Sequence, residues 1–563
     1  MSCSNDDALS DLDKIETYKA SLKTLFTPDN LIVSTSTSEN YITVAFEDGG
    51  DVAMESELVS IAEGYWNLEF VFFDNSILNI GFVSDDLPLD YENDNSLTPL
   101  SKNFQIDLPF DGVITWKTEG RNGASSDISS REIQATAGIN SFTIHGLYID
   151  GFTEVLINYK NSKNNVRYSK NFTLTSNDFL SSIDPINIST TFNLNSDNQR
   201  FILFAHRSGS GPLVIDQFGD IRYYLNITPT VLDRPFYGLK QTSNGSLIWA
   251  NINKINEYGL NGSLITDHNI PDKYGVIHHD IVKYDEGIYL LTVNNNELTT
   301  IEDIIILYDA NTGTTIKEWD LNISVPKTDF FIGNDGFTDT WNDWFHVNAI
   351  EYVDSDQTLL ISGQRSGVVK VSWDNELIWF LTDDKRFTNE PESMQDKILF
   401  NQFNEVITWG QHNIRYDEIN EDYYLFDNGL GRNYEHVELF SRGVKFKVDE
   451  NNFTYEILDS YGEEFPEHHS PIISGIDFSQ EGNTLNLFGS IGYELTYTNN
   501  KDWFGRIWKD PQPNYGAVIQ EYDANGDLIL EFQISSFVTD INHRFYNRDP
   551  GIYRASYFNF DIL

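Results

Sequence analysis

The sequence predicts an all-β protein in which a six-bladed β-propeller follows small β-sandwich-like domains. Aromatic residues make up 14% of the 563 residues, with 38 Phe and 29 Tyr but only 3 Met, a balance that favours strands over helices. Tight-turn sequences separate short stretches in which apolar and polar residues alternate, as expected for hairpins. One stretch of this kind, with a polar start, occurs three times between residues 278 and 416.

Residues 1–28 are expected to form a tether. Cys3 lies in the segment MSCSNDD, which resembles the processed start of a bacterial lipoprotein, where the lipidated cysteine follows a small residue and precedes an acidic stretch. We therefore expect a periplasmic or outer-membrane-anchored lipoprotein with its lipid on Cys3; the alternative is an incidental thiol. A single cysteine excludes an internal disulfide. No long apolar run occurs, so no membrane-spanning helix is expected.

Two β-rich segments follow the tether. Residues 30–96 are expected to form a small β-unit, with strands in 41–50 and 66–74, that ends in an acidic, proline-containing linker. Residues 98–180 are expected to form a β-sandwich-like domain with alternating strands such as 112–117. This domain resembles an immunoglobulin-like sandwich but lacks the Cys–Trp–Cys pattern of that fold.

Residues 186–563 are expected to form the propeller. Its structural units begin near the following residues: Phe201, Tyr237, His278, Phe345, Gln411 and Ser470. Hairpin turns of the form Asp-x-x-Gly, such as those at 216–219 and 523–526, recur within these units. Six four-stranded units that close into a ring place the opening strand of each unit along a central channel. The segment around Tyr553 and Arg554 is expected to close the ring or to border its pocket.

Three copies of one local pattern contain the histidines that are candidates for chemistry. The copies are HHDIVKY at 278–284, HVNAIEY at 346–352 and GQHNIRY at 410–416. Because successive side chains of a strand point to opposite faces, His346 and Asn348 are expected to point together, as are His278 and Asp280. His412 occupies the Asn348 position when the copies are aligned on the closing Tyr. The polar starts of all three copies are therefore expected at one mouth of the channel.

Five segments resemble the bacterial aryl-sulfate sulfotransferases that need no nucleotide sulfate donor. They are HHDI at 278–281, DWFHVNAIEY at 343–352, LLISGQRSGVVKVSWD at 359–374, WGQHNIRY at 409–416 and FDNGLGR at 426–432. One such segment arises easily by chance, whereas five in the same order are specific. The resemblance covers roughly residues 186–563 and is less clear over 98–180.

The resemblance implies an enzyme that moves a sulfuryl group from an aryl sulfate donor to a phenolic acceptor. It implies a ping-pong mechanism through a sulfohistidine, with no cofactor and no metal. In the family, the residue that matches His412 becomes transiently sulfated, so this role is carried over to His412. The positions that match residues around the sulfuryl group are His278 or His279, His346, Asn348 and Arg365.

These residue types suit the chemistry. A neutral histidine is a nucleophile when its second ring nitrogen is held by an acceptor. Arg365 offers a fork of permanent donors, Asn348 offers a neutral donor, and His346 or the 278/279 pair can protonate the leaving phenolate. Strand alternation favours His278 over His279 as the inward residue, with His279 as the alternative.

Composition and the same residues leave two other classes of function open. The formal net charge of −49 excludes nucleic acid as an expected partner, because phosphate binding needs clustered Lys and Arg. The histidines and Asp280 suggest a metal-dependent propeller hydrolase or lyase. Against it, the 346 and 412 motifs offer no carboxylate ligands, and Arg365 is a poor neighbour for a cation. A non-catalytic, surface-bound binding propeller is the third possibility.

Overall fold

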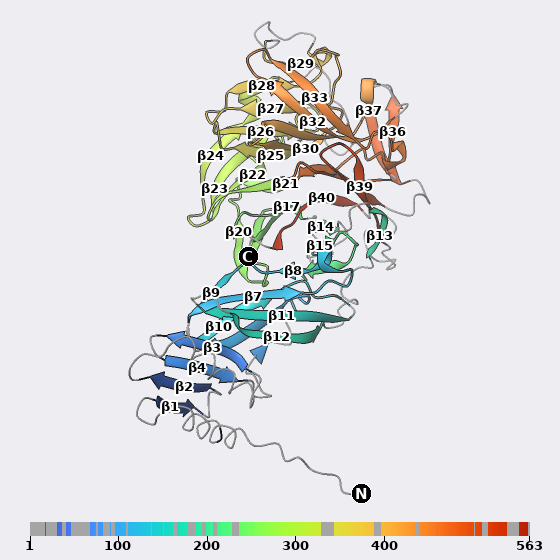
Figure 1. Ribbon diagram of the computed structural model, residues 1–563. Helices are drawn as coiled ribbons and strands as arrows, with labels where there is room; N and C mark the ends of the chain where they lie inside the picture. The colour runs from blue at the N-terminus through green and yellow to red at the C-terminus, as the bar shows by residue number, and fades with distance from the viewer. Residues whose placement is uncertain are drawn as a thin grey trace, which may run out of the picture.

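A computed structural model gives the structure of the protein (Figure 1). It describes residues 17, 31–36, 41–46, 68–74, 77–82, 90–91, 96–108, 111–136, 138–149, 151–161, 166–176, 186–193, 199–206, 211–227, 236–327, 343–387, 396–434, 439–491, 493–499, 502–508, 516–536 and 551–560. Cys3 and, apart from Thr17, the predicted tether lie outside these residues. None of the helices among them is long and apolar enough to cross a membrane.

The N-terminal part of the chain forms three sheets. The first has the strand order β1 (Leu31–Ser36), β2 (Tyr41–Phe46), β4 (Ile77–Phe82), β3 (Leu68–Asp74). The second has the order β10 (Gly138–Ile144), β6 (Lys102–Leu108), β5 (Asp90–Tyr91). The third has the order β12 (Val166–Thr175), β11 (Phe152–Asn161), β7 (Gly112–Thr118), β8 (Ile128–Ser129), and β9 (Ile133–Ala135) also pairs with β7. Every second residue of β7 is buried, including Ile114 and Trp116, as expected for a strand with one face on a core.

The chain from β13 onward is a β-propeller, so the predicted all-β propeller class is confirmed. Within the described residues it has six sheets of four or five strands and one separate two-stranded sheet. The innermost strands of the six sheets are β40 (Ile552–Tyr557), β17 (Tyr237–Gln241), β21 (Tyr274–Asp285), β25 (Val347–Val353), β30 (His412–Asp417) and β34 (Gly475–Phe478). Each of these strands contacts the next, and β40 contacts β17, so the six strands surround one axis.

The outer strands complete the sheets. Beside β40 lie β14 (Phe201–His206), β15 (Leu213–Asp216) and β16 (Ile221–Tyr224); beside β17 lie β18 (Leu247–Asn251), β19 (Lys254–Tyr258) and β20 (Leu264–Asn269). Beside β21 lie β22 (Ile288–Asn295), β23 (Ile304–Asp309) and β24 (Thr314–Asp320); beside β25 lie β26 (Thr358–Gly363), β27 (Gly367–Val371) and β28 (Leu377–Leu381). Beside β30 lie β31 (Asp422–Asp427), β32 (Arg442–Asp449), β33 (Thr454–Tyr461) and β29 (Phe400–Asn401); beside β34 lie β35 (Thr484–Phe488), β38 (Ala517–Tyr522), β39 (Leu528–Ser536) and β13 (Ile186–Asn193). The separate pair is β36 (Tyr493–Asn499) and β37 (Asp502–Trp508).

Helices are few and short. The only α-helix with assigned bounds in the described residues is α3 (Leu321–Ser324). The 3-10 turns are Ala124–Ser126, Asp384–Arg386, Arg432–Tyr434 and Pro466–His468. By contrast, β26 and β27 are buried at every residue, because a propeller sheet is covered on both faces by its neighbours.

Two strand pairs close the ring. β40 pairs antiparallel with β14, and β13 pairs antiparallel with β39. The expected closure at Tyr553 and Arg554 is therefore observed, and it places both residues on an innermost strand. This closure also explains why Phe201 begins the second strand of its sheet rather than the first, because the C-terminal segment supplies the innermost one.

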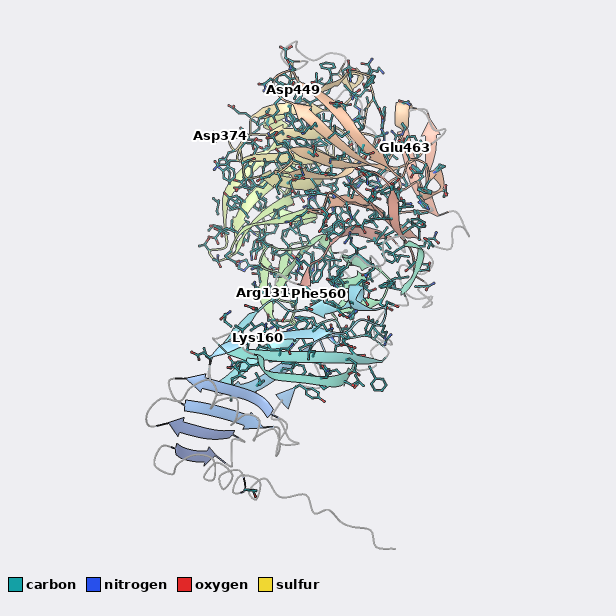
Figure 2. All side chains as sticks on the ribbon, in the orientation of Figure 1. Arg131, Lys160, Asp374, Asp449, Glu463 and Phe560 are labelled. Carbon is teal, nitrogen blue, oxygen red and sulfur yellow. The ribbon has the colours of Figure 1, made fainter. Side chains whose placement is uncertain are left out.

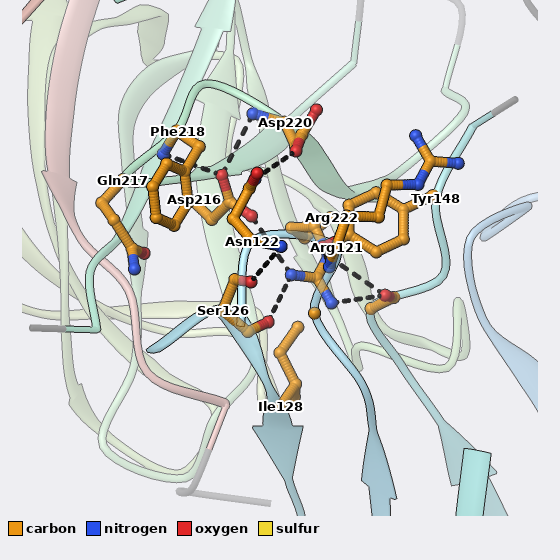
Figure 3. A network of polar contacts seen from close by, with 12 residues as sticks. Arg121, Asn122, Ser126, Ile128, Tyr148, Asp216, Gln217, Phe218, Asp220 and Arg222 are labelled. Carbon is orange, nitrogen blue, oxygen red and sulfur yellow. Dashed lines mark hydrogen bonds and ion pairs between the residues drawn. The ribbon is translucent and has the colours of Figure 1, made fainter. Parts of the chain in front are cut away.

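The propeller and the sandwich-like domain meet through Arg222 of β16, whose side chain is fully buried (Figure 3). Its Nη2 and Nε donate to the Gly146 carbonyl at 2.9 and 3.1 Å. Its Nη1 donates to the Ser126 carbonyl at 2.6 Å and to Asp216 Oδ2 at 3.1 Å. Its guanidinium carbon lies 4.2 Å from the centroid of the Tyr148 ring. One charged side chain thus joins blade and sandwich with its donors satisfied.

The side chains labelled in Figure 2 include one buried at this junction and three exposed on the propeller. Phe560 lies at the junction, where it belongs to a buried cluster shared by the two domains. Asp374, Asp449 and Glu463 are exposed on the propeller, in keeping with the acidic composition.

Candidate active site

The polar starts of β21, β25 and β30 lie where the strand ladder is interrupted. Residues 278–280 have no ladder partner in β22, and the registers of β25 and β30 shift at Asn348 and Asn413. His279, His346 and Asn413 have φ angles of 56°, 59° and 63°. Such irregularities re-aim side chains and are frequent beside active sites. The strict alternation expected from the sequence therefore does not hold here.

His278 and His279 both lie in the site. His278 Nδ1 is 2.9 Å from His279 Nδ1. The ring of His279 lies edge-on to the ring of His346, with centroids 4.9 Å apart. Alternation favoured His278 as the inward residue, but the left-handed backbone at His279 turns this side chain toward His346 as well. Burial lowers the pKa of both histidines, so both are neutral near pH 7.

His346 lies between two carboxylates. Its Nδ1 is 2.8 Å from Asp343 Oδ2 and 2.8 Å from Glu302 Oε2. Burial alone would lower the pKa of His346, but the charges of Asp343 and Glu302 outweigh it and raise the pKa to about 10. Burial would raise the pKa of Glu302, but attraction to the charge of His346 holds it well below its usual range. His346 is therefore an imidazolium at neutral pH.

Arg365 holds Asp343 through both the side chain and the carbonyl of that residue. Its side chain is 1% exposed, its Nη2 is 2.9 Å from Asp343 Oδ2, and its Nη1 donates to the Asp343 carbonyl at 2.8 Å. The sequence predicts that Arg365 surrounds the sulfuryl group. In the structure, two of its donor nitrogens hold Asp343, the carboxylate that contacts His346.

Asn348 joins two neighbouring blades. Its Nδ2 donates to the Gln411 carbonyl at 2.7 Å. Asn413 Nδ2 makes the corresponding bond to the Ile476 carbonyl, also at 2.7 Å. The alignment on Tyr equates Asn348 with His412, whereas these contacts equate it with Asn413. The difference arises because the strand irregularity falls at a different distance from the closing Tyr in each copy.

The tautomer of His412 is fixed by its neighbours. Its Nδ1 faces two acceptors, Asn428 Oδ1 at 2.9 Å and the Gly410 carbonyl at 3.2 Å, so Nδ1 carries the proton. Its Nε2 accepts from the Ile473 N–H at 3.2 Å, so Nε2 carries the lone pair. Asn428 is itself oriented, because its Nδ2 donates to the carbonyls of Ser470 and Ile473 at 2.6 and 2.9 Å.

Burial also keeps His412 neutral. The side chain is 3% exposed, and burial lowers its pKa to about 3; the charge of His346 acts in the same direction. The two sequence-predicted histidines thus have opposite properties, since His346 is held protonated and His412 is held neutral. When the pKa values of two titratable groups in one site are shifted in opposite directions, one group commonly acts as the acid and the other as the base or nucleophile.

Aromatic rings complete the site. Tyr237 and Tyr553 pack edge to face with centroids 5.4 Å apart. Their ring centroids lie 5.6 and 6.1 Å from that of His279. These rings provide an apolar wall beside the histidines, of the kind that an aryl group packs against.

Further along the same strands, each of the six innermost strands contributes one charged side chain to a partly buried layer. The ion pairs are Lys240–Asp280 at 3.1 Å, Arg554–Asp280 at 3.8 Å, Arg415–Glu351 at 3.5 Å and Arg415–Asp477 at 2.8 Å. Asp280 also accepts from the Ile350 N–H at 3.1 Å. Asp280, which the sequence groups with the histidines, therefore links strands in this layer.

Two triads among the described residues have the composition of a metal site. They are His278, His279 and Glu302, and Glu302, Asp343 and His346, with ligand atoms within 4.8 Å of one another in each. The sequence-based argument that carboxylates are absent was wrong, because Asp343 lies three residues before His346 and Glu302 reaches the site from the β22–β23 connection. The donor set suits a borderline metal such as Zn²⁺. Arg365 and protonated His346, however, already balance the charges of the two carboxylates.

The structure thus brings His278, His279, His346 and His412 together. Arg365 contacts His346 through Asp343, and Asn348 bonds to the Gln411 carbonyl beside His412. Sequence reasoning missed Glu302, Asp343 and Asn428. Asp343 and Asn428 are both present in the family-like segments, but they were not assigned a role. Glu302 had no local signal, since it belongs to no repeat.

Comparisons with known proteins identify the family of the chain. The family model described as arylsulfotransferase (ASST) matches residues 162–544. The arylsulfate sulfotransferase AssT of Escherichia coli O6:H1 is 25% identical over 309 residues, which are 45% of this chain and 51% of the relative. The arylsulfate sulfotransferase AssT of Lelliottia amnigena is 25% identical over 326 residues, 48% of this chain and 54% of the relative. The chain spans about half the length of these curated relatives.

Among solved structures, a protein of unknown function from Bacteroides caccae has a TM-score of 0.36 and 9% identity, covering 64% of this chain and 100% of its own. The family model, by contrast, matches more than half of the chain and includes all four site histidines and Arg365. The chain belongs to the arylsulfotransferase family.

Proposed function

We propose that the protein is a nucleotide-independent aryl-sulfate sulfotransferase that works by a ping-pong mechanism through a sulfohistidine at His412. The observation that carries this proposal is the fixed tautomer of His412. Its Nδ1–H faces two acceptors, and the lone pair on Nε2 is unprotonated at any pH above about 3. A histidine in this state is ready to attack sulfur.

In the first half-reaction, Nε2 of His412 exchanges the weak 3.2 Å bond from the Ile473 N–H for a bond to sulfur. The bond between sulfur and the phenolic oxygen breaks, and its electron pair leaves with the phenolate. The imidazole becomes positively charged, and its Nδ1–H remains on Asn428 and Gly410. Positioning and electrostatics carry most of the barrier in such loose transition states, by analogy with phosphoryl transfer.

His346 protonates the leaving phenolate. The pKa of about 10 that Asp343 and Glu302 impose on His346 matches the pKa of about 10 of an ordinary phenol, so proton transfer is nearly balanced. In the second half-reaction, neutral His346 takes the proton of the acceptor phenol, the acceptor oxygen attacks sulfur, and the N–S bond breaks. Both histidines return to their starting states.

The test is a donor-only incubation with a chromogenic aryl sulfate. We expect a burst of phenol equal to the enzyme concentration, an intact-mass increase of one sulfuryl group, and steady turnover only after a phenol acceptor is added. The burst should survive chelators. A protein that releases no phenol and gains no mass would refute the proposal.

A metal-dependent hydrolase is the second candidate, and the Glu302–Asp343–His346 triad is the observation that favours it. It predicts phenol release without acceptor, loss of activity on chelation and recovery with Zn²⁺. These outcomes are opposite to those of the sulfotransferase, so one set of assays separates the two.

A further inference from the structure

The ring-closing strand β40 brings into the site one polar side chain, that of Tyr553, to which the sequence assigns no chemical role. Tyr553 is 5% exposed and lies between Tyr237 and His279. The sequence predicts that the segment around Tyr553 closes the ring or borders its pocket. It lies beyond residue 544, where the match to the family model ends, so the family match says nothing about it.

The hydroxyl of Tyr553 is buried and has no hydrogen-bond partner within the described residues. An unsatisfied buried hydroxyl destabilises the folded state, and native structures rarely keep one without a reason. His278 Nε2, in the same site, is also buried and unpartnered in this part of the chain. Two unpartnered polar atoms on the walls of one site offer hydrogen bonds to a polar ligand.

The ring contacts hold the hydroxyl in place. Tyr237 packs against the Tyr553 ring edge to face, and the Arg554 guanidinium carbon lies 5.6 Å from its centroid. Arg554 is in turn anchored, since its Nη2 donates to the Asn348 carbonyl at 2.9 Å. A donor that is oriented before the ligand arrives needs no reorganisation during the reaction, which is the property that makes transition-state donors effective.

We propose that Tyr553 is a further catalytic residue, whose phenolic O–H donates a hydrogen bond to a sulfuryl oxygen of the aryl sulfate. This inference rests on the proposed sulfotransferase function. The hydroxyl keeps its proton throughout, so the transfer remains between the donor oxygen, His412 Nε2 and the acceptor oxygen. Burial raises the pKa of Tyr553 well above its usual value, which suits a group that donates a hydrogen bond without ionising.

The test compares Tyr553→Phe with Tyr557→Phe, which removes the same atom from the same strand. The Tyr557 hydroxyl donates to Glu521 at 3.0 Å, away from the histidines. We expect Tyr553→Phe to slow the donor burst about 10²- to 10³-fold, as loss of one transition-state donor does, and Tyr557→Phe to leave it unchanged. Thermal unfolding of Tyr553→Phe should occur at the same or a higher temperature than that of the wild type, because no existing bond is lost.

A second measurement does not depend on turnover. An arylmethanesulfonate, in which a CH2 group replaces the bridging oxygen, has no leaving phenol, and its binding can be titrated by calorimetry. Tyr553→Phe should weaken its binding about tenfold, and Tyr557→Phe should not. The wild type could show this tenfold higher affinity over Tyr553→Phe and yet give no burst. In that case the sulfotransferase proposal fails, and the assignment of Tyr553 as an anion-binding residue stands.

Two results would overturn the inference. One is an unchanged burst and unchanged sulfonate affinity in Tyr553→Phe. The other is a sulfuryl adduct that peptide mapping places on Tyr553 itself. Tyr553 would then accept the sulfuryl group instead of donating a hydrogen bond to it.

Discussion

The junction at Arg222 and the head of the propeller axis are both buried and polar, yet they are built in opposite ways. At the junction, the Arg222 donors meet two carbonyls and a carboxylate, and its face meets the Tyr148 ring. At the head of the axis, Tyr553 Oη and His278 Nε2 are buried without partners among the described residues. The Arg222 contacts fix the relative position of two domains, whereas the unpartnered atoms at the head of the axis keep hydrogen-bonding capacity that the protein itself does not use.

Backbone conformation shows the same contrast. The positive φ angles near the junction belong to glycines, namely Gly123, Gly146 and Gly219. At the head of the axis Gly410 and Gly429 have positive φ angles too, but so do six residues with side chains, namely His279, Glu302, His346, Asn413, Ile473 and Ser474. Glycine adopts this conformation without cost, whereas Ile473, a β-branched residue with φ of 51°, does not. Strain of this kind persists where the surroundings impose it, most often at functional sites.

The largest expected effect is the loss of His412. His412→Asn removes the nucleophile, so the burst and the mass adduct should disappear and turnover should fall about a thousandfold or more. Circular dichroism should be unchanged, since Asn fits a buried polar position. A variant that keeps its burst would move the nucleophile to His278 or His279.

The next effect concerns His346 and depends on the donor. His346→Gln removes the acid, so turnover of donors whose phenol has a pKa near 10 should fall by about 10²- to 10⁴-fold. Nitrophenyl donors, whose phenolates leave without a proton, should be affected far less.

Arg365→Lys should lower turnover by about tenfold to a thousandfold, because it loosens the hold on Asp343. The loss should depend on the leaving group in the same way as for His346→Gln. Equal losses for all donors would show that these residues do not act through the acid.

A substitution at the junction should change the free energy of unfolding and leave the burst rate unchanged. Arg222→Met leaves Asp216 buried without its cation, and breaking a buried pair in this way costs about 3–5 kcal/mol of unfolding free energy. Lys117→Met is the control, because the pair of Lys117 with Asp127 is about one-third exposed and contributes about 0–1 kcal/mol. Urea unfolding measures both, and the burst rate should be unchanged in both. A slower burst in Arg222→Met would show that the junction shapes the site.

The smallest expected effect is the pH dependence of stability. Burial lowers the pKa of His145 at the junction to about 3 and that of His412 to about 3, against about 6.5 in the unfolded chain. Below pH 6.5 the unfolded chain therefore binds more protons, and each histidine lowers stability by up to about 1.4 kcal/mol per pH unit down to its folded pKa. His145→Gln should make the slope of unfolding free energy between pH 6.5 and 5 shallower by that amount. An unchanged slope would show that His145 is protonated in the folded protein.

Sequence reasoning found the parts of the site that repeat and missed the parts that do not. The propeller class, His346 and His412 were accessible because strands, turns and motif spacing are local signals. Glu302 was not, since it enters from a connection between two strands and meets His346 only through the packing of adjacent blades. Asn428 was missed as well, because its contact with His412 joins two strands. The orientation of His279 depends on a strand irregularity that alternation alone does not reveal.

Closure of the ring joins segments that are far apart along the chain. Thr191 bonds to Glu531, 340 residues away, and Gln241 bonds to Asn559, 318 residues away. Contacts of such high sequence separation form slowly, because the entropy of a long loop is lost before the contact stabilises anything. Tyr553 reaches His279 only when β40 has entered between β14 and β17. On refolding, bulk β-sheet content should therefore return before enzymatic competence, and the recovery of activity reports the moment at which the ring closes.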